Sequence, residues 1–131
     1  MSDLVLIVED NAKNMKLARD LLQYHGFTIL EATTAEDGLV LAAAHCPDVV
    51  LMDILLPDMD GESALRSLRA NPATAALRVV ALTASAMRED RVRLLAAGFD
   101  GYISKPIDIR AFPDQVRRYC ESGAREESKT A

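Results

Sequence analysis

The stretch Val49–Gly61, VVLMDILLPDMDG, ends an apolar run on a charged side chain. The run leads directly to Asp53, and Pro57 and Gly61 follow soon after it. A short, continuous apolar run is typical of a β-strand that is covered on both faces, as in a parallel sheet. We therefore expect a buried strand that presents an aspartate at its carboxyl end.

Similar apolar runs recur along the chain, and each is followed by a segment with helical spacing of apolar residues. The expected strands are Leu4–Val8, Phe27–Ala32, Asp48–Met52, Arg78–Thr83 and Gly101–Ser104. The expected helices are 11–26, Ala35–His45, Gly61–Arg69, Arg88–Ala97 and Ile109–Tyr119. This alternation predicts an α/β, flavodoxin-like doubly wound fold, with a five-stranded parallel sheet in the order 2-1-3-4-5. Because Pro113 removes a hydrogen-bond donor, we expect the last helix to be kinked or to start late.

The composition indicates one globular domain. The chain has 131 residues, and the 50% that are hydrophobic suffice for a core without disulfide or metal staples. We expect the domain to span residues 1–121, followed by a flexible polar tail over 122–131 and no output domain. Cys46 and Cys120 belong to no metal-spaced motif, so we expect free thiols.

The net charge of −5 disfavours non-specific binding to nucleic acid or to an anionic membrane. The first apolar run is too short for a signal peptide, and no stretch approaches the roughly 20 apolar residues of a membrane span. We therefore expect a soluble, cytoplasmic protein that binds neither nucleic acid nor membrane.

Polar side chains stand at the ends of four expected strands. Glu9 and Asp10 follow the first, Asp53 ends the third, Thr83 ends the fourth and Lys105 follows the fifth. In an open α/β sheet, ligands bind at the carboxyl ends of the strands, where the strand order reverses. The first and third strands flank that point, so three carboxylates are expected to converge there.

Three neighbouring carboxylates repel one another and need a cation in order to stay ionised together. Oxygen ligands suit Mg²⁺, and Lys105 supplies a second positive charge. A divalent cation, a lysine, the Thr83 hydroxyl and a spare carboxylate predict a phosphoryl-transfer site in which a carboxylate forms an acyl phosphate. Each residue alone has a structural explanation, such as helix capping by Glu9 and Asp10, but their convergence favours a site.

Four motifs together resemble the receiver domains of two-component response regulators. The motifs are LIVEDN (residues 6–11), VVLMDILLPDMDG (49–61), VVALTA (79–84) and YISKP (102–106). They occur in the family's order, and the resemblance covers about residues 4 to 120. The stretches EDNAKNMKLARDLL and LTASAMRED are similar to single-domain, DivK-like regulators and to receivers of phosphorelays.

The resemblance implies that Asp53 accepts a phosphoryl group from a histidine kinase or a histidine phosphotransfer protein. Asp10 and Asp53 would bind Mg²⁺ directly, with Mn²⁺ as a substitute. Glu9 would act through water, and Leu55 would add its main-chain carbonyl. Lys105 would contact the phosphoryl group. The Lys105–Pro106 peptide bond would be cis, which is inexpensive only before proline.

The resemblance also implies a switch formed by Thr83 and Tyr102. On phosphorylation the surface of the fourth helix, fifth strand and fifth helix would change and signal to a downstream protein, with the chain monomeric or dimerising on phosphorylation. Leu55 and Ser85 would set the lifetime of the acyl phosphate. Because the Leu55 side chain cannot orient an attacking water, we expect slow self-dephosphorylation, and no enzymatic activity beyond these self-reactions.

The first helix would suit docking of a helical phosphotransfer partner through Asn11, Asn14 and Met15. Met15 is equally consistent with a place in the core, and the sequence leaves this choice open. The main alternative function is a receiver-like docking module that works without phosphorylation. A haloacid-dehalogenase-type phosphatase would need a second carboxylate where Leu55 stands. A flavin carrier would need a hydroxyl- and glycine-rich loop in place of EDNAKN.

Overall fold

A computed structural model describes residues 3–84 and 87–121 of the chain; Ser85 and the expected tail over 122–131 lie outside these ranges. The strands are β1 (Leu4–Val8), β2 (Thr28–Ala32), β3 (Val49–Asp53), β4 (Val79–Thr83) and β5 (Gly101–Ser104). The helices are α1 (Ala12–Tyr24), α2 (Ala35–His45), α3 (Gly61–Ala70), α4 (Arg88–Ala97) and α5 (Phe112–Glu121). Within the described ranges, no helix is both long enough and apolar enough to cross a membrane.

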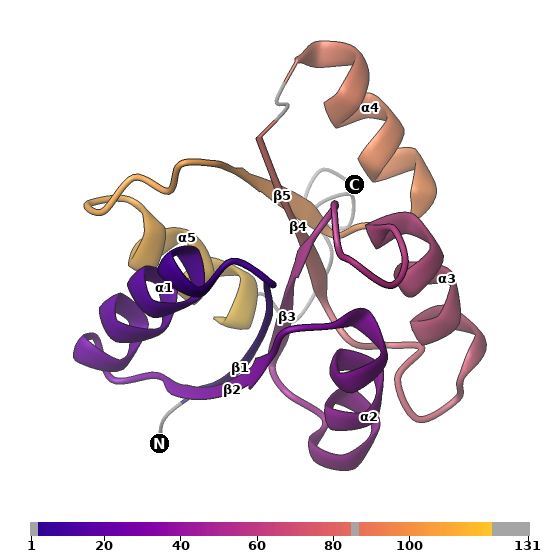
Figure 1. The fold of residues 1–131 in the computed structure, drawn as a ribbon, viewed down its shortest axis with the longest axis horizontal. Coiled ribbons are helices and arrows are strands. Elements are labelled where there is room, and N and C mark those ends of the chain that lie inside the picture. The colour runs from indigo at the N-terminus through magenta and orange to yellow at the C-terminus, as the bar shows by residue number, and fades with distance from the viewer. Residues whose placement is uncertain (1–2, 85–86, 122–131) are drawn as a thin grey trace.

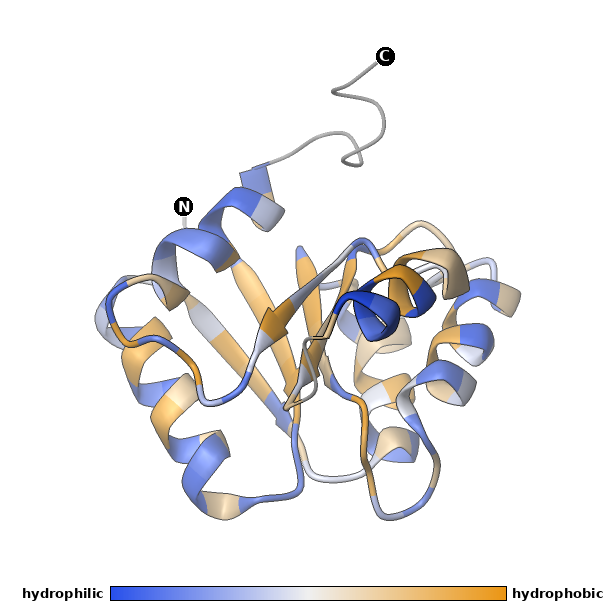
Figure 2. Cartoon of the chain, turned by 90° about the horizontal axis from the view of Figure 1, so that it is seen from above, coloured by the Kyte–Doolittle hydropathy of each residue, from blue (hydrophilic) through white to orange (hydrophobic). Residues whose placement is uncertain are grey.

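All strand pairs are parallel, and the sheet has the order β2-β1-β3-β4-β5, which confirms the predicted topology (Figure 1). Helices α1 and α5 cover one face, and α2, α3 and α4 cover the other. Side chains alternate along each strand, so Val5 and Ile7 join the core beneath α1 and α5 while Leu6 and Val8 join the opposite core. Figure 2 shows the apolar strands between these two helical layers.

Local sequence signals explain where the first two helices begin and how they pack. The Asn11 side chain accepts a hydrogen bond from the Asn14 amide at 3.0 Å and caps α1. Gly38 allows α2 to approach the sheet closely, because a Cβ atom there would lie 2.8 Å from the Val8 side chain. The small size of Gly38 therefore lets the N-terminal part of α2 lie close to the carboxyl end of β1.

The last helix begins at Phe112 rather than at Ile109, so the expected start was wrong and the late start caused by Pro113 is confirmed. Pro113 lies in the first turn of α5, where its missing amide hydrogen has no partner to lose.

The end of β3 also differs from the expected boundary. Strand β3 runs to Asp53 instead of ending at Met52, so Asp53 itself pairs with Leu82 of β4.

Both cysteines are free thiols, as the sequence predicts. Cys46 is exposed and caps α2 in the left-handed region, at φ 46°. Cys120 is half-buried in α5, and burial raises the pKa of its thiol to about 12. Because the thiolate is the reactive form, Cys120 is a poor nucleophile at neutral pH.

Candidate functional site

Three carboxylates meet at the carboxyl edge of the sheet. Val8 of β1 and Met52 of β3 are partners in register, and the residues that follow them are Glu9 and Asp53, which therefore lie side by side. One carboxylate oxygen each from Glu9, Asp10 and Asp53 lies within 4.8 Å of the others. Glu9 and Asp53 are buried and Asp10 is exposed, so the cluster opens to solvent on the Asp10 side.

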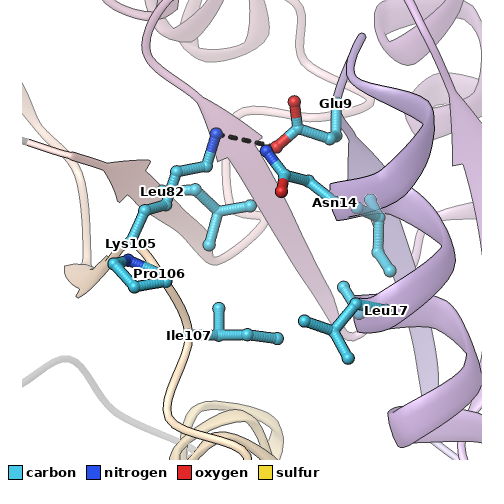
Figure 3. A pocket seen from close by; sticks show the side chains of 9 residues that line it. Glu9, Asn14, Leu17, Leu82, Lys105, Pro106 and Ile107 are labelled. Atoms are coloured by element: carbon cyan, nitrogen blue, oxygen red, sulfur yellow. Dashed lines mark ion pairs between the residues drawn. The ribbon is translucent and has the colours of Figure 1, made fainter.

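Lys105 completes the cluster from the segment after β5. Its Nζ lies 2.7 Å from Glu9 Oε1 and 2.8 Å from Asp53 Oδ2. Figure 3 shows the side chain extended toward Glu9. The Lys105 amide donates to the Thr83 carbonyl at 2.8 Å, and the Lys105–Pro106 peptide bond is cis, as the resemblance implies. The structure thus joins residues from the segment after β1, from β3 and from the β5–α5 connection.

Burial and neighbouring charges shape the titration of this cluster. Burial raises the pKa of Glu9, and the neighbouring Asp53 raises it further although Lys105 opposes the shift. For Lys105, burial acts to lower the pKa, but hydrogen bonds to Asp53 and Glu9 outweigh it, so the pKa is raised. Lys105 therefore stays cationic at neutral pH, and one ammonium faces three carboxylates.

The loop after β3 holds Asp53 in a defined orientation. The Leu55 amide donates to Asp53 Oδ1 at 3.0 Å, while Lys105 binds the other oxygen. The Gly61 amide donates a hydrogen bond to the Ile54 carbonyl at 2.8 Å. A Cβ atom on Gly61 would lie 2.9 Å from the Ile54 Cα, so only glycine allows this close approach. The Leu55 side chain points away from the core and is 77% exposed.

Thr83 and Tyr102 lie on neighbouring strands. Thr83 is buried at the end of β4. Tyr102 of β5 pairs in register with Ala81, which precedes Thr83 by two residues in β4. Because side chains two residues apart share a face, Thr83 and Tyr102 lie on the same side of the sheet. The Tyr102 hydroxyl accepts a hydrogen bond from Arg91 Nη1 of α4 at 3.3 Å, and the guanidinium lies 5.9 Å from the ring centroid.

A small pocket of about 50 Å³ lies beside the cluster, between α1 and the segment that follows β5 (Figure 3). It is lined by Ile7, Glu9, Asn14, Leu17, Ala18, Leu82, Lys105, Pro106 and Ile107. Met15 is buried and belongs to the core, which settles the choice that the sequence left open. Asn14 and the exposed Leu17 are the α1 residues that border the pocket from the surface.

Sequence reasoning missed two aspartates in the loop after β3. Asp60 caps α3 by accepting a hydrogen bond from the Ser63 amide at 2.7 Å. The rule that aspartate precedes a helix would have found it. Asp58 accepts hydrogen bonds from the amides of Ala35 and Glu36, both at 2.9 Å. No local pattern reveals that contact, because its partners precede Asp58 by more than 20 residues.

The family model for the response regulator receiver domain matches residues 5–117. The chain belongs to this family. Among curated relatives, the polar-differentiation response regulator DivK of Brucella ovis is 39% identical over 119 residues, which cover 91% of this chain and 97% of DivK. This receiver domain is therefore DivK-like and acts in two-component signalling, a role of signalling proteins rather than of conventional enzymes.

Solved structures agree with this assignment. The receiver domain of the sensor histidine kinase PA1611 from Pseudomonas aeruginosa has a TM-score of 0.84 at 30% identity and covers 93% of this chain and 100% of its own. That structure holds a magnesium ion in its active-site cleft. A CheY-like receiver domain protein from Methanospirillum hungatei has a TM-score of 0.82 at 27% identity, with full coverage of both chains.

Proposed function

We propose that this receiver domain accepts a phosphoryl group on Asp53 from a histidine kinase or a histidine phosphotransfer protein, in a reaction that requires Mg²⁺. The observation that carries the proposal is the position of Asp53. Its carboxylate is buried, lies 2.8 Å from the Lys105 ammonium and shares its surroundings with two further carboxylates. A docking scaffold has no need to hold three like charges together against their mutual repulsion.

The donor set at this edge fits Mg²⁺. It offers oxygen atoms from three carboxylates. Asp10 and Asp53 would bind the ion directly, Glu9 would act through water, and Leu55 would contribute its main-chain carbonyl. Mn²⁺ prefers similar ligands and would substitute. The bound ion supplies positive charge that offsets the charge of the phosphoryl group in transfer. Because Lys105 carries one positive charge and the cluster has three carboxylates, a further cation is needed to balance their charge.

The chain's own residues divide the chemical work. A carboxylate oxygen of Asp53 attacks the phosphorus of the donor phosphohistidine, so that a P–O bond forms as the P–N bond breaks. The Lys105 ammonium, which binds Asp53 in this structure, is within reach of the oxygens of the arriving group. The Leu55 amide keeps Asp53 from rotating, which lowers the entropic cost of the attack.

The phosphoryl donor would approach over α1. The pocket between Asn14, Leu17 and Ile107 lies directly beside Lys105 and is open to an apolar side chain of a helical partner. Asn11 and Asn14 lie at the start of the same helix and offer polar contacts at its edge. This surface therefore supports docking that brings the phosphohistidine of the partner to Asp53.

After phosphorylation, Thr83 would turn toward the new oxygens and Tyr102 would follow it inward. Tyr102 would then leave its hydrogen bond with Arg91, which connects the event at Asp53 to α4. The surface formed by α4, β5 and α5 would change and bind a downstream protein, or a second phosphorylated copy.

The acyl phosphate is proposed to be long-lived. The exposed Leu55 side chain has no group that can orient an attacking water, and Ser85 would be the second residue that sets the lifetime. A Leu55→Asn variant adds such a group and is expected to lose its phosphoryl group several-fold faster. An unchanged decay rate in this variant would contradict the role given to Leu55.

Incubation of the full chain with acetyl phosphate tests the proposal, with the intact mass as readout. The wild type is expected to gain one phosphoryl group with Mg²⁺ present and none with EDTA, and Asp53→Asn is expected to gain none. Absence of any gain in the wild type, or an equal gain in Asp53→Asn, would favour the alternative of a docking module that works without phosphorylation.

A further inference from the structure

We propose that Asp58 is a positioning residue for the metal site, because it ties the loop after β3 to the N-terminus of α2 and so holds Leu55 in place. This inference rests on the proposed function, since Leu55 is there a metal ligand through its carbonyl. The Asp58 carboxylate makes its hydrogen bonds to α2 rather than to the carboxylate cluster. Its role would be to fix the backbone that carries one of them.

Both oxygens of Asp58 are used on α2. Oδ1 accepts from the Ala35 amide and Oδ2 accepts from the Glu36 amide, each at 2.9 Å. These are the first two amides of the helix, which have no partner within it. The positive end of the helix dipole adds to the attraction for a carboxylate. The amides of Ala35 and Glu36 accordingly hold the pKa of Asp58 below its usual value.

A second side chain caps the same helix from the chain just before it. Thr34 Oγ1 accepts a hydrogen bond from the Asp37 amide at 3.1 Å, and Thr34 is the N-cap residue of α2. Two residues therefore share the capping of one helix, and they differ in origin. Thr34 comes from the chain just before α2, whereas Asp58 comes from the loop that follows Asp53. This difference provides a matched control.

The loop needs a directional anchor because its functional part is exposed. Leu55 is 77% exposed, yet its amide holds Asp53 Oδ1 at 3.0 Å. On the far side of the loop, Leu55 forms a backbone bridge with Asp60, whose side chain caps α3. Partly buried apolar side chains of the loop, from Ile54, Leu56 and Met59, also pack on the core.

These hydrogen bonds attach the loop to two helices, α2 and α3. Asp60 joins it to α3, the helix that follows directly in the chain, and Asp58 joins it to α2, an element that precedes it. Apolar packing resists removal of the loop from the core but sets no orientation for its peptide groups. The two hydrogen bonds of Asp58 do set an orientation. Loss of Asp58 should therefore leave the fold intact. Leu55 then keeps only its amide bond to Asp53 and its bridge to Asp60, so its carbonyl has more freedom to reorient.

Metal titration of the full chain tests this inference. Asp58→Ala, Asp58→Asn, Thr34→Ala and the wild type are titrated with MgCl₂, and backbone amide NMR shifts report binding. Asp58→Ala is expected to weaken Mg²⁺ binding about tenfold, the low end of the cost of losing a partner that orients a metal ligand. Asp58→Asn keeps one acceptor oxygen and should recover part of the affinity. Thr34→Ala weakens the same helix and should bind Mg²⁺ like the wild type.

Amide hydrogen exchange without metal gives a second readout. In Asp58→Ala, exchange should be faster at Leu55 as well as at Ala35 and Glu36. In Thr34→Ala, the increase should be confined to the start of α2. This pattern separates an effect on the loop from a general weakening of the helix.

Four outcomes have distinct meanings. Wild-type affinity and wild-type exchange at Leu55 in Asp58→Ala would overturn the positioning role, and so would an equal loss of affinity in Thr34→Ala. Absence of Mg²⁺ binding by the wild type would contradict the proposed function, and the inference with it. If Asp58→Ala does not fold, Asp58→Asn decides the question, because its expected affinity still lies below that of the wild type.

Discussion

The sheet holds a buried carboxylate paired with a cation at each end of its strands. The N-terminal strand ends form the amino edge and the C-terminal strand ends form the carboxyl edge, and the two pairs have different roles. At the amino edge, Arg69 Nη2 lies 3.0 Å from Asp100 Oδ2, with side chains 21% and 5% exposed. At the carboxyl edge, Lys105 Nζ lies 2.8 Å from Asp53 Oδ2, with side chains 18% and 9% exposed. Distance and burial are nearly equal, so neither explains why the proposed functional site lies at the carboxyl edge.

The amino edge is closed. The Arg69 guanidinium also donates to the carbonyls of Ala75, Leu77 and Gly98, and Asp100 Oδ2 also accepts from the Val79 amide. Among the described residues, one guanidinium meets one carboxylate here, and the planar fork of arginine joins α3, the loop before β4 and the turn before β5. Such a cluster stabilises the fold.

The carboxyl edge is left unbalanced. Lys105 is shared by Glu9 and Asp53, and Asp10 adds a third, exposed carboxylate. The excess of negative charge can be met by a divalent cation, and a single ammonium leaves room for an arriving phosphoryl group. Charge balance and the number of fixed donors, rather than burial, distinguish the proposed functional cluster from the structural one.

The largest effect on stability is expected at the amino edge. Arg69→Met leaves Asp100 buried without its cation and three carbonyls without a donor, so the free energy of unfolding should fall by about 3 kcal/mol. Urea unfolding measures it. Arg66→Met, on the exposed face of the same helix, is the matched control and should change stability by less than about 0.5 kcal/mol. Equal effects of the two variants would show that the Arg69 cluster is not structural.

Matched aspartate-to-asparagine changes should have opposite signs at the two edges. Asp100→Asn removes a balanced charge and should cost about 2 kcal/mol of unfolding free energy. Asp53→Asn removes one of three like charges and should add about 1 kcal/mol in metal-free protein, because repulsion falls. Thermal or urea unfolding in EDTA compares them. A loss of stability in Asp53→Asn would mean that Lys105 already balances the carboxyl edge.

Magnesium should stabilise only through the carboxyl edge. At ten times its dissociation constant, a ligand that binds only the folded state adds about 1.4 kcal/mol. Unfolding with and without MgCl₂ should show this gain in the wild type and in Asp100→Asn, and should not show it in Asp10→Asn. A gain in Asp10→Asn equal to that of the wild type would place the ion elsewhere.

The smallest expected effect is on the pH dependence of stability. The pKa of Glu9 is raised above 4.5 in the folded state, mainly by burial, so the folded protein binds this proton more tightly than the unfolded chain does. Stability in EDTA should therefore fall as pH rises from 4.5 through the folded pKa. The difference in stability between Glu9→Gln and the wild type should grow over that range. A constant difference would show that Glu9 titrates normally.

The sequence predicted the fold because its signals are local. Continuous apolar runs identify buried strands, the Asn11 cap begins α1, and Pro113 limits the start of α5 to Phe112. The carboxylate cluster was also predictable, since strand order alone brings the carboxyl ends of β1 and β3 together. These inferences needed only periodicity and a topological rule.

The clusters that depend on distant partners could not be predicted. Asp58 and Arg69 look like ordinary surface charges in the sequence, and their partners Ala35 and Asp100 lie 23 and 31 residues away. No periodic pattern encodes such contacts, because they depend on how loops meet after the core has formed. The role of Met15 was undecided for the same reason, since helical spacing does not reveal how far the core extends around α1.

We propose that the unbalanced carboxyl edge makes Asp53 the phosphoacceptor. The most direct test is to react the full chain with acetyl phosphate and Mg²⁺ and to locate the phosphoryl group by tandem mass spectrometry after rapid digestion, in the wild type and in Asp100→Asn. The account predicts modification at Asp53 in both proteins. A phosphoryl group on Asp10 or Glu9, or an unmodified Asp53 in the wild type, would contradict it.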